Sequence, residues 1–233
     1  MLIHDIINMG GVIMKKILNN FTIESATTIS YFDDIVNFVL KNEKDILDFF
    51  KLEKLPQKFN IIIMNYDDFK DVQIKAYGKV IDYVRGITNG STNTIMILTI
   101  EDQLKYTTHK NATLDDTLKM ILHEVVHACN SVVAKFYYQT AWLQEGLATN
   151  LANQNYSLMD LSECDFELLK NDFINYGKNN YTFAYTIVNF ILNNYDKEIV
   201  YKLITDSNYL RDNDNRLFEE AKQHMLNEKL SKR

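Results

Sequence analysis

The segment Thr113-Leu-Asp-Asp-Thr-Leu-Lys-Met-Ile-Leu-His123-Glu124-Val-Val-His127-Ala-Cys129 sets both the chemistry and much of the architecture expected of this chain. Its apolar residues recur at helical spacing and form one stripe, made of Leu114, Leu118, Ile121, Leu122, Val125 and Cys129. Thr113 is expected to cap this helix, with Asp116 as its partner in an acidic capping box. At about 100° per residue, His123 and His127 lie together on the opposite face. Two imidazoles four residues apart on one helical face have the geometry of two ligands to one metal ion.

A carboxylate suited to be the third ligand follows 18 positions after His127, in Trp142-Leu-Gln-Glu145-Gly-Leu-Ala148. Catalytic zinc takes three protein ligands and keeps a fourth position for water. Glu145 lies in a second predicted helix over about 141–152, and a turn through about 134–139 would let that helix fold back against the first. The pattern therefore predicts one zinc ion, held by His123, His127 and Glu145.

Glu124 follows a predicted ligand directly without being a ligand itself. Zinc lowers the pKa of a bound water molecule towards ~7 and polarises a scissile carbonyl. A carboxylate beside that water accepts its proton and later passes it to the leaving amine. The sequence therefore predicts that Glu124 is the general base of a zinc-dependent hydrolase.

Taken together, the two motifs resemble those of the gluzincin peptidases, in which His-Glu-x-x-His is followed by a Glu-Gly-x-Ala helix. The chain is similar in particular to the small bacterial peptidase MA-like family, which has a Trp-Leu-x-Glu-Gly-Leu-Ala signature. This resemblance covers roughly residues 83–206 and implies a zincin-like fold and a peptide or protein substrate. It also implies that a tyrosine stabilises the oxyanion, and Tyr181 and Tyr185 are the candidates. The zincin plan further implies that Thr94–Thr99 is an edge strand to which an extended peptide could pair.

The separation of His127 and Glu145 is one residue shorter than in the best-known aminopeptidases of this clan. No separate exopeptidase motif precedes the predicted zinc helix, so endopeptidase or unassigned specificity is expected instead. Two alternatives remain open: a zinc-binding regulatory or structural domain without catalysis, and a hydrolase of non-peptide amides. The presence of Glu124 argues against the first, because a structural zinc site has no use for a base and closes with four protein ligands.

The remaining pattern predicts an α+β fold that is zincin-like, with a small mixed β-sheet and a predominantly helical C-terminal half. Only one proline and seven glycines interrupt the chain, which favours long helices. Helices are expected over about 32–52 and 66–77, and strands near 59–65, 80–87 and 94–99.

Two regions are expected along the chain. An N-terminal helical segment over 1–55 would precede a zincin-like metallopeptidase domain over 56–233. Residues 1–13 would be an extension or a mis-called start. Apolar runs are too short to span a bilayer, and the first twenty residues lack the order of a secretory signal.

Composition excludes several kinds of partner. The net charge of −6 and the absence of a basic block argue against nucleic acid and against an anionic membrane. The two cysteines, Cys129 and Cys164, form no Cys-x-x-Cys pair and are too few for a disulfide scaffold. We expect a cytoplasmic protein that acts on a peptide or protein, and the sequence does not specify its oligomeric state.

Overall fold

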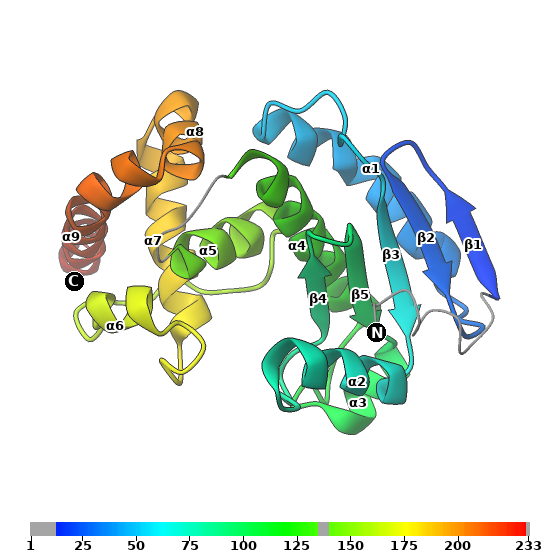
Figure 1. The fold of residues 1–233 in the computed structure, drawn as a ribbon. Helices are drawn as coiled ribbons and strands as arrows, with labels where there is room; N and C mark the ends of the chain where they lie inside the picture. The colour runs from blue at the N-terminus through cyan, green and yellow to red at the C-terminus, as the bar shows by residue number, and fades with distance from the viewer. Residues whose placement is uncertain (1–12, 135–139, 232–233) are drawn as a thin grey trace. The chain divides into compact units, whose positions relative to one another are not determined.

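The computed structural model describes residues 13–134 and 140–231, and the chain divides into two compact units (Figure 1). The first unit is Met1–Val132 and the second is Val133–Arg233. Along the described residues, no helix is both long and apolar enough to cross a membrane. The turn expected through about 134–139 and the proposed extension over 1–13 fall almost entirely outside the described residues.

The first unit is built on a five-stranded sheet with the order β1-β2-β3-β5-β4. The strands are β1 (Met14–Ile17), β2 (Phe21–Ser25), β3 (Phe59–Met64), β4 (Gly86–Asn89) and β5 (Thr94–Leu98). The three inner strands are parallel to one another, and each edge strand pairs antiparallel with its neighbour. The inner strands are buried along nearly all of their length, so both faces of the sheet are covered. The prediction of a small mixed sheet is confirmed.

The helices among the described residues of the first unit are α1 (Phe32–Phe49), α2 (Tyr66–Tyr77), α3 (Ile100–Tyr106) and α4 (Leu114–Val133). Helices α2 and α3 start directly after β3 and β5, and Figure 1 shows them together at one end of the sheet. The side chains of Asn65 and Thr99 cap them by accepting hydrogen bonds from backbone N–H groups in the first turns. The carboxylate of Asp102 in α3 also accepts a 2.8 Å hydrogen bond from the Tyr66 N–H, which ties the two helix starts together.

The two faces of the sheet carry different partners. On one face, alternate residues of β3, β4 and β5 pack with α2 in a cluster of Ile62, Met64, Phe69, Val72, Ile87, Met96 and Leu98. The opposite face includes Gly86 and Thr88 of β4, which lie against Glu124 of α4. Helix α4 therefore packs against the edge strand β4 through Glu124, which contacts Gly86 and Thr88, two residues apart on that strand.

Three sequence-based expectations need correction. The segment over 1–55 is not only helical, because it contains β1 and β2, and β2 pairs in parallel with β3 across the expected boundary at residue 55. The strand expected over 80–87 is the shorter β4, Gly86–Asn89. The segment Thr94–Thr99 is not an edge strand, because β5 lies between β3 and β4.

Among the described residues of the second unit, the regular elements are all helices, and there is no strand. Its helices are α5 (Ala141–Leu151), α6 (Phe166–Asn171), α7 (Asn180–Asn194), α8 (Lys197–Thr205) and α9 (Ser207–Ser231). The expected α+β class with a predominantly helical C-terminal half is confirmed.

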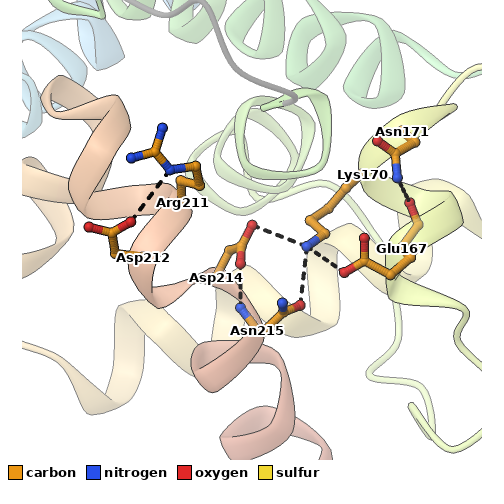
Figure 2. A network of polar contacts seen from close by, with 7 residues as sticks. All are labelled: Glu167, Lys170, Asn171, Arg211, Asp212, Asp214 and Asn215. Carbon is orange, nitrogen blue, oxygen red and sulfur yellow. Dashed lines mark hydrogen bonds and ion pairs between the residues drawn. The ribbon is translucent and has the colours of Figure 1, made fainter.

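A buried lysine joins α6 to α9 within the second unit (Figure 2). The Lys170 ammonium lies 2.7 Å from a carboxylate oxygen of Glu167 and 3.3 Å from one of Asp214. It also donates a 3.1 Å hydrogen bond to the Asn215 side chain. The side chains of Lys170 and Asp214 are only 4% and 2% exposed, so their two charges face each other with little water around them.

Candidate metal and catalytic site

Helix α4, which carries the first motif, begins at the predicted cap. The Thr113 hydroxyl accepts a 3.1 Å hydrogen bond from the Asp116 N–H, and the Asp116 carboxylate accepts one of 3.0 Å from the Thr113 N–H. This reciprocal pair confirms the acidic capping box. Residues 120–126 and 128–130 of the helix are all buried, so the face that carries His123 is enclosed as well as the apolar stripe.

His123 and His127 direct ring nitrogens at the same point. Their Nε2 atoms are 3.0 Å apart, and their rings meet edge to face with centroids 4.7 Å apart. His123 is 7% exposed, and His127 is half-buried. Converging imidazole nitrogens on successive turns of one helix are what two histidine ligands of a single metal ion require.

Glu124 is buried between α4 and strand β4. Its side chain is held by Thr88, whose hydroxyl Oγ1 donates a 2.7 Å hydrogen bond to Glu124 Oε2. The same carboxylate lies directly over Gly86, where an added β-carbon would be 2.7 Å from Oε1. Sequence reasoning identified Glu124 but missed both β4 residues. The available signal for Gly86 was its place inside a predicted strand, because a glycine there often marks a site where another group approaches the backbone closely.

Cys129, two residues after His127, is a buried apolar position and not part of the site. It is fully buried, and burial together with the nearby Glu43 charge raises the pKa of its thiol to about 12. At neutral pH this thiol is protonated and inert. The prediction that Cys129 serves as a small hydrophobic residue is confirmed.

Glu145 lies on α5, in the second unit, and the residues around it explain the signature Trp142–Ala148. Trp142 is fully buried and meets Phe166 of α6 edge to face at 5.3 Å. Gly146 leaves room for α7, because an added β-carbon there would be 2.6 Å from the Ala184 carbonyl oxygen. Glu145, which is half-buried, therefore lies along α5 after a tryptophan that packs against α6 and directly before a glycine that allows α7 to pack closely.

Asn150 fixes α5 against α7. Its amide donates hydrogen bonds of 2.7 Å to the Gly146 carbonyl and 3.0 Å to the Tyr185 carbonyl. Its side-chain oxygen accepts a 3.0 Å hydrogen bond from Asn189. These bonds set the backbone of α7 at Tyr185 relative to the backbone of α5 beside Glu145.

Tyr181 and Tyr185 lie one turn apart on α7, and both are half-buried. Tyr181 meets Phe173 edge to face, with ring centroids 5.2 Å apart. The Tyr185 ring lies 5.7 Å from that of Tyr156. Both rings therefore have aromatic neighbours of their own, in the same unit as Glu145.

The donor set of His123, His127 and Glu145 fits a divalent metal of the zinc type. Each residue offers one ligand atom: His123 and His127 offer an imidazole nitrogen each, and Glu145 offers a carboxylate oxygen. Two histidines and one glutamate are a ligand combination found in catalytic zinc sites that keep a position for water.

Comparison with known proteins finds a distant structural likeness. No protein-family model matches this chain, and no curated protein does. Among solved structures, the chain is similar to an aminopeptidase N family protein from Idiomarina loihiensis, with 13% sequence identity and a TM-score of 0.38. The similar region covers 60% of this chain and 24% of that protein, so the chain spans about a quarter of its relative's length.

Proposed function

We propose that this protein is a zinc-dependent metallopeptidase that hydrolyses peptide bonds. One zinc ion would be held by His123, His127 and Glu145, with Glu124 as the general base. The observation that carries the proposal is the convergence of two imidazoles on the helix that also carries a buried, hydrogen-bonded carboxylate. A site that only stabilised the fold would have no need of that fourth group.

Each proposed residue has a distinct task in the reaction. When bound, zinc would lower the pKa of a water molecule towards ~7 and polarise the peptide carbonyl. Glu124 accepts the proton of the attacking water and then delivers it to the nitrogen of the leaving amine. The hydroxyl of Tyr181 or Tyr185 donates a hydrogen bond to the oxyanion that forms on the carbonyl carbon.

The substrate class proposed is a peptide or protein, with endopeptidase or unassigned specificity in place of aminopeptidase activity. Support for this comes from the sequence, in which no exopeptidase motif precedes α4. A zinc-binding domain without catalysis and a non-peptide amide hydrolase are the alternatives, and activity measurements separate them.

The decisive experiment compares the native protein with Glu124→Gln. Both are loaded with zinc, and cleavage of fluorescein-labelled casein and of a fluorogenic peptide library is measured. Loss of a general base lowers turnover by roughly 10²–10⁴-fold. We expect Glu124→Gln to keep its zinc and lose turnover to this degree. Equal turnover in the two proteins would contradict the mechanism. A native protein that binds zinc but cleaves no peptide would contradict the peptidase proposal, and hydrolysis of non-peptide amide substrates would then separate the two alternatives.

Metal analysis tests the ligand set independently of activity. We expect His123→Ala, His127→Ala and Glu145→Ala each to lose near-stoichiometric zinc after dialysis. The matched control is His109→Ala, because His109 bonds the Tyr83 carbonyl and is not part of the donor set. Retention of full zinc by Glu145→Ala would remove the third ligand from the proposal.

A further inference from the structure

Two residues of the edge strand β4 face the proposed general base. Gly86 and Thr88 are two apart on one strand, so they share one face of the sheet. The backbone of β4 is fixed by antiparallel pairing with β5, in which Gly86 lies opposite Ile97 and Thr88 opposite Ile95. Both positions therefore have a defined place relative to Glu124 on α4, within one compact unit.

The Thr88 hydroxyl is bonded to Glu124 in a way that engages one carboxylate oxygen only. Oγ1 lies 2.7 Å from Oε2 and 3.1 Å from the backbone carbonyl oxygen of Glu124. A hydroxyl has one hydrogen to donate, and the charged oxygen at the shorter distance is the stronger acceptor. Oε1 takes no part in this bond, so the two oxygens of Glu124 are not equivalent.

Gly86 provides the space in which that carboxylate lies. A β-carbon at residue 86 would be 2.7 Å from Oε1, 2.9 Å from Cγ and 3.1 Å from Cδ of Glu124. Any side chain at this position would therefore push Glu124 out of its present rotamer. The conformation of the Glu124 side chain is therefore restricted both by the β4 backbone at Gly86 and by the hydrogen bond from Thr88.

We propose that Thr88 is a positioning residue for the general base, and that Gly86 is required to leave room for it. This inference rests on the proposed function. Thr88 holds Oε2, which leaves Oε1 to accept the proton of the attacking water, and the carboxylate enters each cycle already oriented. A catalytic group held in its working geometry loses no time and no free energy in finding it.

The test uses two substitutions of Thr88 and one matched control. Thr88→Val keeps the shape of the side chain and removes the hydroxyl, whereas Thr88→Ser keeps the hydroxyl. Thr94→Val is the control, because Thr94 is a threonine of the same sheet whose hydroxyl donates to the Thr92 carbonyl and not to Glu124. We expect Thr88→Val to lower kcat roughly tenfold or more, with KM and zinc content unchanged, because only the transition state uses the oriented base. Thr88→Ser and Thr94→Val should stay within about threefold of native.

Urea unfolding of the metal-free protein gives a second readout that needs no activity. Thr88→Val, Glu124→Ala and the double variant form a cycle, and the contact predicts that the double variant loses less than the sum of the two single losses in unfolding midpoint. Strictly additive losses would overturn the positioning role.

The outcomes separate this inference from the proposed function. If the native protein is active and Thr88→Val is as active as Thr94→Val, the positioning role is wrong and the peptidase proposal stands. If the native protein cleaves nothing, the proposed function fails and the catalytic meaning of the contact fails with it. Gly86→Ala adds a steric test: it should lower kcat as Thr88→Val does, and a Gly86→Ala protein with native kcat would contradict the requirement for space.

Discussion

Gly146 of α5 packs directly against Val188 of α7: a β-carbon added to Gly146 would overlap the Val188 Cγ2 atom. Overpacking of this kind costs typically 1–3 kcal/mol, which exceeds the ~1 kcal/mol that alanine gains over glycine in a helix. Because one of the clashing atoms belongs to the backbone, we expect the upper part of that range for Gly146→Ala, which is a net loss of up to about 2 kcal/mol in the free energy of unfolding, measured by urea titration.

The control for this prediction is the double variant Gly146→Ala, Val188→Ala. Removing the valine methyl groups should relieve part of the clash, so the double variant should lose less than the sum of the single losses. Relief stays partial because the Ala184 carbonyl, at 2.6 Å, belongs to the backbone and cannot be trimmed. A Gly146→Ala protein as stable as native would show that α5 and α7 are not in close contact.

The two candidate tyrosines are distinguished by single hydroxyl deletions. Removal of one oxyanion donor lowers kcat by about 10²–10³-fold. We expect this loss in either Tyr181→Phe or Tyr185→Phe and only a small change in the other, measured on the same fluorogenic peptide. Tyr156→Phe, next to Tyr185, is the matched control. Native activity in both Tyr181→Phe and Tyr185→Phe would remove a tyrosine from the mechanism.

The charge cluster around Lys170 predicts that removal of one charged partner destabilises the protein more than removal of both. Removal of one partner of a buried ion pair strands the other charge, and the cost is about 3–5 kcal/mol. We expect a loss of this order in the free energy of unfolding for Lys170→Met and a smaller loss for Asp214→Asn, because Glu167 still pairs with Lys170 in that variant. The double variant Lys170→Met, Asp214→Leu should lose less than either single change.

Glu167→Gln is the natural control for that series. The Glu167 side chain is 65% exposed, and exposed ion pairs contribute only about 0–1 kcal/mol. If Glu167→Gln cost as much as Asp214→Asn, burial would not be what gives the cluster its strength.

The buried thiols predict a loss of stability in mild alkali. The pKa of Cys129 is raised to about 12 by burial and by Glu43, whereas an unfolded cysteine titrates near ~8.5. A raised folded-state pKa gives stability that is complete below ~8.5 and declines as the pH rises towards about 12, because only the unfolded chain loses the proton. From pH ~8.5 to ~10 we expect this thiol alone to lower the free energy of unfolding by about 1–2 kcal/mol.

Urea titrations at pH 7, 8.5 and 10 would measure this effect. Cys129→Ala should show a shallower decline with pH than native. Cys164, whose pKa burial raises to about 11, contributes in the same direction, so the double alanine variant should be shallower still. An unchanged pH dependence in the double variant would assign the decline to other groups.

Local signals in the sequence predicted the helices well. The capping box at Thr113 and the apolar stripe behind it placed α4, and the helix expected near 66–77 has those same bounds in the structure. These features depend on residues within one or two turns of each other, which makes them readable without knowledge of the fold.

The sheet was harder to predict because pairing joins residues that are distant in sequence. Strands β1 and β2 are four and five residues long, too short to stand out, although Phe21 and Ile23 of β2 do alternate with more polar residues. The inner place of β5 is indicated by Ile95-Met-Ile-Leu98, an unbroken apolar run typical of a strand buried on both faces.

The apolar run before β4 was misread for a different physical reason. Residues near 80–84 resemble a strand, but their backbone bonds to a side chain and not to a neighbouring strand. The Gln73 side chain accepts a 2.6 Å hydrogen bond from the Ile81 N–H and donates one of 3.5 Å to the Val84 carbonyl. The Gln73 side chain thereby supplies hydrogen-bond partners to backbone groups of this loop, which the apolar pattern alone assigns to the sheet.

The candidate site divides in the same way. The two histidines and Glu124 follow from one short motif, and Trp142–Ala148 supplied the third proposed ligand. The surroundings of Glu124 could not be deduced, because Thr88 is 36 positions away and reaches it only through the fold. The residues proposed to take part in the reaction could be predicted from short motifs, whereas the strand residues that hold Glu124 in place could not.

The pairing of β4 with β5 has a consequence for how insertions and deletions would act on this protein. Successive strand residues point to opposite sides, so a slip of one position turns the whole strand over. Such a slip, introduced by one residue added to or removed from the turn at 90–93, would bring the bulky Ile87 beneath Glu124 and send Thr88 into the apolar cluster against α2. The length of this small turn is therefore as tightly constrained as the chemistry of the carboxylate that lies above the strand.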